Sequence, residues 1–176
     1  MAEVLILMSS PRVNGNTSKL VDAFIKGLNS YEVEKVYLSK LAIKPCLGCN
    51  VCQSSNKCVQ RDDMLELYQK MLEAKVIVYA SPVYFYTFNG IMKNFIDRTF
   101  AIEKVISNKE FYLLASGLAI DESYFKIIHD TFDKYISCLR AGGNTFKDYV
   151  FACGDIEGNV ALDKAYTLAK GIVIDE

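Results

Sequence analysis

Apolar residues fall into two repeating patterns along the chain. Runs that are apolar at nearly every position, such as residues 4–8 and 76–80, are typical of parallel strands buried on both faces. Longer segments with apolar residues three and four apart, such as residues 17–28, are typical of helices with one buried face. The patterns predict strands at residues 4–8, 32–38, 76–80, 110–115 and 144–152, and helices at residues 17–28, 62–72, 91–100, 122–139 and 158–170.

Strands and helices therefore alternate along the whole chain. This alternation predicts an α/β three-layer sandwich, in which a five-stranded parallel sheet of order 2-1-3-4-5 carries helices on both faces. No linker or repeat interrupts it, so residues 1–176 are expected to form a single domain. Ligands of such sheets bind beyond the carboxyl ends of the strands, where three polar segments follow: residues 9–16, 81–90 and 116–121.

Composition narrows the classes of function. A formal net charge of −1 gives no reason to expect nucleic acid or an anionic membrane as partner. No apolar run approaches the length of a membrane span, and the first residues do not resemble a secretion signal, so a cytoplasmic location is expected. In that compartment, clustered cysteines among the six are expected to serve metal, cluster or redox roles rather than disulfides.

The first polar segment joins a buried strand to the start of a helix. Free backbone N–H groups and the helix dipole attract phosphate at such a place. Gly15 permits a tight turn, Arg12 adds positive charge, and further donors come from Ser10, Asn16, Thr17 and Ser18. The patterns G-x-x-x-x-G-K-[ST] and G-x-G-x-x-G are both absent, which excludes a Walker-type site and a dinucleotide fingerprint. A plain polar turn with a helix cap remains an alternative.

The second segment, residues 81–90, is rich in aromatic residues and directly follows a buried strand. A flat heteroaromatic ring requires an apolar wall with nearby backbone polar groups, and this segment can supply both. Alternatively, the aromatic side chains pack in the core or at a subunit interface, which is the preferred interpretation for Tyr86 and Phe88. Ser116 and Gly117 end the neighbouring strand and can reach the same place.

Four cysteines fall within a loop at residues 42–62, with the spacing Cys46-x-x-Cys49-x-x-Cys52-x₅-Cys58. A loop of this length inside a compact domain is usually functional. Four thiolates so close in sequence can surround one tetrahedral ion or one cubane cluster. Zinc, an iron–sulfur cluster and unligated reactive thiols all remain open on spacing alone. Cys138 and Cys153 lie apart from this group and are expected to be small buried apolar residues.

Taken together, these motifs give a specific resemblance. The segments are S-P-R-V-N-G-N-T at 10–17, S-P-V-Y-F at 81–85, G-x-x-K-x-F-x-D-R at 90–98, and the cysteine motif leading into D-D-M at 62–64. They resemble the flavodoxin-like NAD(P)H-dependent FMN reductase and iron–sulfur flavoprotein superfamily. The likeness covers roughly the first 100 residues. Ser9 departs from it, since the family usually has glycine there.

The resemblance implies a flavodoxin-like fold and assigns roles to the matching residues. It implies that the FMN phosphate is bound by Ser10, Arg12, Asn16 and Thr17. It implies that the flavin ring is bordered by Pro82, Val83, Tyr84 and Phe85, with Ser116 and Gly117 approaching it. It implies that a [4Fe–4S] cluster is bound by Cys46, Cys49, Cys52 and Cys58. Asp97 and Arg98 then look like a structural ion pair or a dimer contact.

The expected function is that of an FMN-dependent oxidoreductase, either an NAD(P)H-dependent flavin or quinone reductase or an iron–sulfur flavoprotein. Electrons come from NAD(P)H or from a ferredoxin-like donor, and the resemblance implies a homodimer or homotetramer. The alternative is a flavodoxin-type electron-transfer protein without its own pyridine-nucleotide activity. Because a flavin supplies the chemistry, no catalytic acid–base residue is expected, and His129, the only histidine, is given no role.

Overall fold

A parallel sheet forms the centre of the computed structural model, which describes residues 2–28, 30–158 and 160–174. Its strands are β1 (Val4–Met8), β2 (Val33–Tyr37), β3 (Val76–Tyr84), β5 (Glu110–Gly117) and β6 (Thr145–Cys153). They lie in the order β2-β1-β3-β5-β6, and a short strand β4 (Thr87–Phe88) pairs antiparallel with β3. Counted over the parallel strands, this is the predicted order 2-1-3-4-5.

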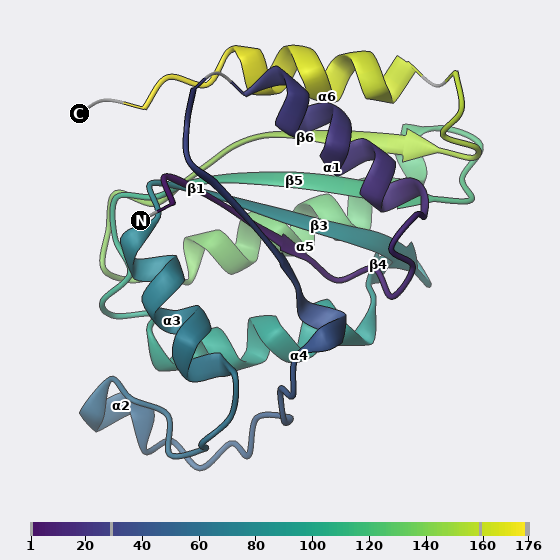
Figure 1. Ribbon diagram of the computed structural model, residues 1–176. Helices are drawn as coiled ribbons and strands as arrows, with labels where there is room; N and C mark the ends of the chain where they lie inside the picture. Colours follow the sequence, from purple (N-terminus) through teal and green to yellow (C-terminus); the bar gives the residue numbers. More distant parts are fainter. Residues whose placement is uncertain (1, 29, 159, 175–176) are drawn as a thin grey trace.

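Helices cover both faces of the sheet, as Figure 1 shows. One face carries α1 (Asn16–Gly27) and α6 (Val160–Lys170), and the other carries α3 (Met64–Glu73), α4 (Gly90–Arg98) and α5 (Lys126–Ser137). The predicted three-layer α/β fold is therefore confirmed. Among the described residues, no helix combines the length and the apolar character needed to cross a bilayer.

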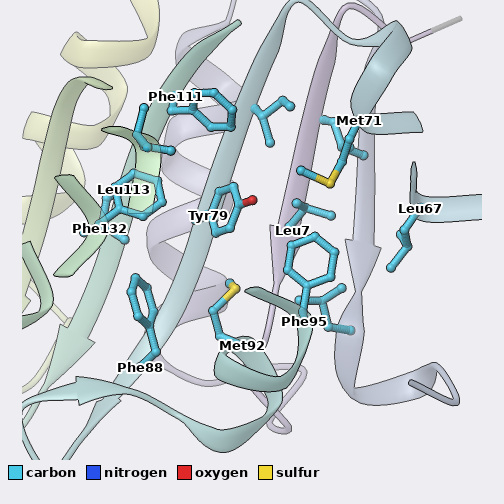
Figure 2. Close-up of a cluster of buried hydrophobic side chains, with 14 of the residues drawn as sticks. Leu7, Leu67, Met71, Tyr79, Phe88, Met92, Phe95, Phe111, Leu113 and Phe132 are labelled. Carbon is cyan, nitrogen blue, oxygen red and sulfur yellow. The ribbon is translucent and has the colours of Figure 1, made fainter. Parts of the chain in front are cut away.

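The larger core lies between the sheet and helices α3, α4 and α5. Figure 2 shows Tyr79 of β3 among the side chains that these helices bring to the sheet. Its ring centroid lies 5.0 Å from that of Phe132, and its hydroxyl lies 2.7 Å from that of Tyr135. The hydroxyl bond satisfies a polar group in an apolar layer. This core supports α3, which the cysteine loop leads into, and α4, whose Arg98 contacts the loop.

On the opposite face of the sheet, α1 and α6 meet at small residues. A Cβ atom built on Gly27 of α1 would lie 2.1 Å from the carbonyl oxygen of Tyr166 in α6. Ala161, Ala165 and Ala169 of α6 are buried on this same face. Packing against α6 therefore holds the C-terminal end of α1, while the strand that precedes α1 positions its start.

Three local predictions were wrong. Residues 81–84 belong to β3 and not to a loop, and β3 turns back into β4. The loop at 42–62 contains a short helix, α2 (Cys52–Ser55), and a 3₁₀ turn (Glu122–Phe125) precedes α5 where one continuous helix was expected. In the first case Pro82 suggested a strand end, but the strand continues through it in register with Ser116.

Candidate functional site

A cavity of about 350 Å³ lies at the carboxyl edge of the sheet. Figure 1 shows α1 beginning at the edge where β3, β5 and β6 end. The lining comes from all three predicted segments: Ser10, Arg12, Gly15, Asn16, Thr17, Pro82, Val83, Tyr84, Ser116, Gly117 and Leu118. We call this cavity the strand-end pocket. Nine of the eleven residues predicted to bind the cofactor line it, while Ser18 and Phe85 do not.

The N-terminus of α1 opens into this pocket without a side-chain cap. Gly15 occupies the N-cap position and has no side chain that could accept a hydrogen bond from the first turn, and that turn contains no acidic residue. The first amide groups of a helix have no acceptor within the helix itself. Together with Arg12 at the pocket wall, they form a positive end suited to a phosphate group.

A contact between two hydroxyl groups joins the start of α1 to the end of β5. The Thr17 and Ser116 side-chain oxygens lie 2.8 Å apart, and the Asn16 amide donates to the carbonyl oxygen of Gly154 at 3.2 Å. Ser10 Oγ accepts from the Arg12 backbone N–H at 3.2 Å. These bonds fix the pocket floor before any ligand binds.

Ser18 lies beneath the first loop rather than on the pocket surface. Its side chain is buried, and its hydroxyl donates to the carbonyl oxygen of Arg12 at 3.4 Å. The role of Ser18 in the structure is therefore to hold the loop.

Strands β3 and β4 form a hairpin at the rim of the pocket. Its two turn residues, Phe85 and Tyr86, have φ angles of 48° and 67°, values that are rare for residues with bulky side chains. A two-residue turn with both φ values positive matches the twist of a hairpin, which usually uses Asn or Gly there. Phe85 is 97% exposed at the tip, and Tyr86 stacks on Tyr124 with ring centroids 6.1 Å apart. Phe88 is buried in the core, in line with the interpretation preferred for it.

Gly117 and Leu118 complete the rim on the third segment. A Cβ atom on Gly117 would lie 3.3 Å from the Cβ of Val83, so a small residue permits β3 and β5 to end close together. Leu118 is 99% exposed and lines the pocket, although the sequence analysis did not select it. The sequence does place this apolar residue directly after Ser116 and Gly117, and that position could have marked it as part of the pocket rim.

The cysteine loop lies elsewhere: in Figure 1 the loop, with its short helix α2, lies beneath α3 and α4. All four cysteines line one concavity together with Arg98, and of the described residues none lines both this concavity and the strand-end pocket. Within the described ranges, no three metal-binding side chains are close enough to form a ready metal site. Burial and the neighbouring Cys58 thiol both raise the pKa of Cys52.

Polar contacts join the two ends of the cysteine loop. Asp62 accepts hydrogen bonds from the backbone N–H of Lys44 at 3.0 Å and from both terminal nitrogens of Arg98, and Arg98 also donates to the carbonyl oxygen of Lys44 at 2.7 Å. Asp63 Oδ2 accepts from the Ala42 N–H at 2.7 Å. Burial alone would raise the pKa of Asp62, but its bonds to Arg98 and Lys44 hold that pKa below its usual range.

These contacts also cap α3, because the Asp62 side chain accepts from the N–H of Met64 at 3.2 Å while Asp63 makes no cap bond. They correct one prediction. Arg98 does form a structural ion pair, but its partner is Asp62. Asp97 pairs instead with Lys93 at the surface of α4.

A second set of contacts fixes the far side of the loop. The side-chain amide of Gln53 in α2 donates to Glu103 at 2.9 Å and accepts from Arg140 at 3.1 Å. The backbone carbonyl oxygen of Gln53 accepts from Lys104 at 2.7 Å. Arg140 forms a further ion pair with Glu103. The loop is therefore connected to the body of the protein at both its ends and its short helix.

The remaining cysteines and the histidine line neither the strand-end pocket nor the cysteine concavity. Cys138 was expected to be buried but is exposed at the end of α5, where it lines a groove shared with Cys46. Cys153 is half-buried at the end of β6. His129 bonds to Asp130 at 3.2 Å and packs against Tyr149.

Known proteins resemble this chain in sequence and in fold. An iron–sulfur flavoprotein of Archaeoglobus fulgidus is 46% identical over 94 residues, which cover 52% of this chain and 43% of that protein. An iron–sulfur flavoprotein of Methanosarcina thermophila is 30% identical over 132 residues, covering 70% and 69%. The chain spans about half the length of several such relatives.

The fold is also shared across the whole chain. The crystal structure of an azoreductase from Bacillus anthracis covers 98% of this chain and all of its own, with a TM-score of 0.74 and 14% identity. The family model for NADPH-dependent FMN reductase matches residues 2–124, which include both the strand-end loops and the cysteine loop. The chain therefore belongs to the NADPH-dependent FMN reductase family, as its motifs predicted.

Proposed function

We propose that the whole chain acts as one FMN-binding domain and passes electrons from NAD(P)H, or from a ferredoxin-like donor, to an acceptor. The observation that carries the proposal is the strand-end pocket, where an uncapped helix N-terminus and three polar segments meet. Such a pocket offers a phosphate site at one end and an apolar wall at the other.

Each end of the pocket takes one part of the cofactor in this proposal. The amide groups at the start of α1, with Ser10, Arg12, Asn16 and Thr17, bind the phosphate, and Ser18 holds the loop from below. Pro82, Val83 and Tyr84 border the flavin ring, and Ser116 and Gly117 face it from the neighbouring strand. Phe85, at the tip of the hairpin, covers the outer rim of the ring. When bound there, FMN supplies hydride and electron transfer, and the protein supplies position and exclusion of water.

We propose that the cysteine loop binds a [4Fe–4S] cluster through Cys46, Cys49, Cys52 and Cys58. The donor set suits this group, because four thiols from one loop line one concavity. The loop's anchors at Asp62, Arg98 and Gln53 hold its backbone near that concavity. A single zinc ion and unligated thiols are the outcomes that iron and sulfide assays would separate from it.

Association into a homodimer or homotetramer in the cytoplasm completes the proposal. Apolar side chains stand exposed around the strand-end pocket, notably Phe85, Leu118 and Ile120. Exposed apolar side chains that gather on one part of a surface often mark an interface. A reducing compartment would keep the six cysteines as thiols.

The deciding experiment compares FMN with riboflavin, which has the same ring but no phosphate. Apoprotein prepared without oxygen is titrated with each while flavin fluorescence is followed, and NADH or NADPH is then added to the FMN complex. We expect FMN to bind about 100-fold more tightly than riboflavin, because the phosphate meets the positive helix end. Bleaching by a pyridine nucleotide supports a reductase. Bleaching only by a reduced ferredoxin supports the protein-donor form, and failure to bind either flavin would overturn the proposal.

A further inference from the structure

Arg98 is an unusually buried cation on α4. Its side chain is 1% exposed and that of Asp62 is 3% exposed, and the two form a paired contact with N–O distances of 2.6 and 3.0 Å. Its backbone carbonyl oxygen accepts from the Tyr68 hydroxyl at 2.8 Å. Burying such an ion pair removes both charges from water, so the pair adds little to the free energy of unfolding. Stability alone therefore does not explain why the pair is present.

The same guanidinium group also contacts a cysteine. Nη2 lies 3.5 Å from Sγ of Cys58, within reach of an N–H···S hydrogen bond, and Arg98 lines the concavity that the four cysteines share. Its Nε–H group is buried and has no hydrogen-bond partner among the described residues. A buried donor left without an acceptor is unfavourable, so the surroundings of Arg98 do not satisfy all of its hydrogen-bonding capacity.

We propose that Arg98 is the positioning residue of the cysteine loop: it joins the loop's two ends and directs Cys58 toward the ligand that Cys46, Cys49 and Cys52 share. The inference rests on the metal-binding part of the proposed function. Lysine could not do the same, because a single ammonium group cannot reach Asp62, Lys44 and Cys58 with separate planar donors.

This role predicts a selective defect. Cys52 is the first residue of α2, and the neighbouring Gln53 fixes that helix to Glu103, Lys104 and Arg140. These contacts do not involve Arg98. Loss of Arg98 should therefore release Cys58 while the other three thiols still bind the metal.

The test uses Co²⁺ alone, added to the full-length apoprotein without oxygen, since thiolate-to-cobalt absorption reports how many thiolates bind. The main variant is R98M combined with D62N, which removes both charges and leaves no unpaired one. We expect its thiolate absorption to fall to that of C58S, and iodoacetamide to alkylate Cys58 in the loaded variant but not in the loaded parent protein. K93M is the matched control, because Lys93 forms an exposed ion pair on the same helix, and it should behave as the parent.

Circular dichroism and FMN binding establish that each variant is folded. If the double variant is not folded, R98K decides, because it retains a charge opposite Asp62: alkylation of Cys58 in loaded R98K supports the inference, and its protection overturns it. Full thiolate absorption with a protected Cys58 in the double variant also overturns it, as does loss of all thiolate absorption at once. A parent protein that binds no Co²⁺ through thiolates overturns this inference and the cluster proposal together, whereas the FMN titration would still stand.

Discussion

The strand-end pocket and the cysteine loop are both built from polar segments, yet they are held in place by different means. The pocket is formed largely by backbone: a glycine at the start of α1, the ends of buried strands, and a close approach at Gly117. The loop lies outside the sheet and depends on side chains, chiefly Arg98, Asp62 and Gln53. A site made by the fold itself should tolerate changes in single side chains, whereas a loop fixed by a few contacts should fail when one is removed.

The largest effect is expected from R98M alone. It leaves the buried carboxylate of Asp62 without its partner, and such a change costs about 3–5 kcal/mol of folding free energy. K93M removes an exposed ion pair on the same helix and should cost less than about 0.5 kcal/mol. Urea unfolding followed by circular dichroism measures both. Equal stability of the two variants would contradict the view that this one contact anchors the loop.

In the strand-end pocket, G15D should act on ligand binding rather than on folding. A carboxylate at the N-cap position suits the helix dipole, so the free energy of unfolding should change by less than about 1 kcal/mol. The same charge repels a phosphate, and FMN affinity should fall about 100-fold. G15A is the control, because its Cβ meets Arg12 at the same 3.1 Å without adding charge. FMN affinity in G15D equal to that in G15A would exclude a phosphate site here.

Acid should affect the loop before the pocket. The folded-state pKa of Asp62 lies below its ordinary value of about 3.9, so its contribution to stability is complete above that pH and is lost as the pH falls through the lowered value. We expect D62N to be less stable than the parent near neutrality and the difference to shrink below pH 3.9. Unfolding curves at several pH values measure this. A difference that is constant with pH would mean that the charge of Asp62 is not involved.

The smallest effect is expected at the hairpin. Phe85 adopts a positive φ that costs a bulky residue free energy, and its side chain makes little contact because it is 97% exposed. F85N should therefore stabilise the protein by about 1 kcal/mol, since asparagine tolerates this conformation. Thermal unfolding tests the change, with N108A as a control that removes asparagine at another positive φ. If F85N were destabilising, Phe85 would be contributing contacts that the isolated chain does not reveal.

The sequence was sufficient for the sheet and for most of the pocket, because both depend on local patterns. Residues 4–8 and 110–115 are apolar enough to be recognised as buried strands, and the residues that follow a parallel strand must lie at its carboxyl edge. The continuation of β3 through Pro82 was missed, since proline normally suggests an end. Leu118 was missed because an exposed apolar residue carries no periodic signal.

The loop's anchors could not be predicted in the same way. Arg98 and Asp62 are 36 residues apart, and no local pattern links a residue on one helix to the start of another. The motif suggested an ion pair with the adjacent Asp97, whereas α4 directs Arg98 inward and Asp97 outward. The exposure of Cys138 was likewise a matter of which helix face is covered, which depends on the packing of α5.

The closed base of the cysteine loop has a consequence for protein engineering. Ala42 and Lys44 on one side, and Asp62 and Asp63 on the other, are joined outside the stretch that carries the thiols. Because these bonds join the two ends of the loop, the residues between them can change without altering the fold of the domain. Lengthening a loop lowers the free energy of unfolding only slightly. The segment between residues 45 and 61 should therefore accept metal-binding sequences of other lengths, provided that Arg98 is kept to hold the two ends of the loop together.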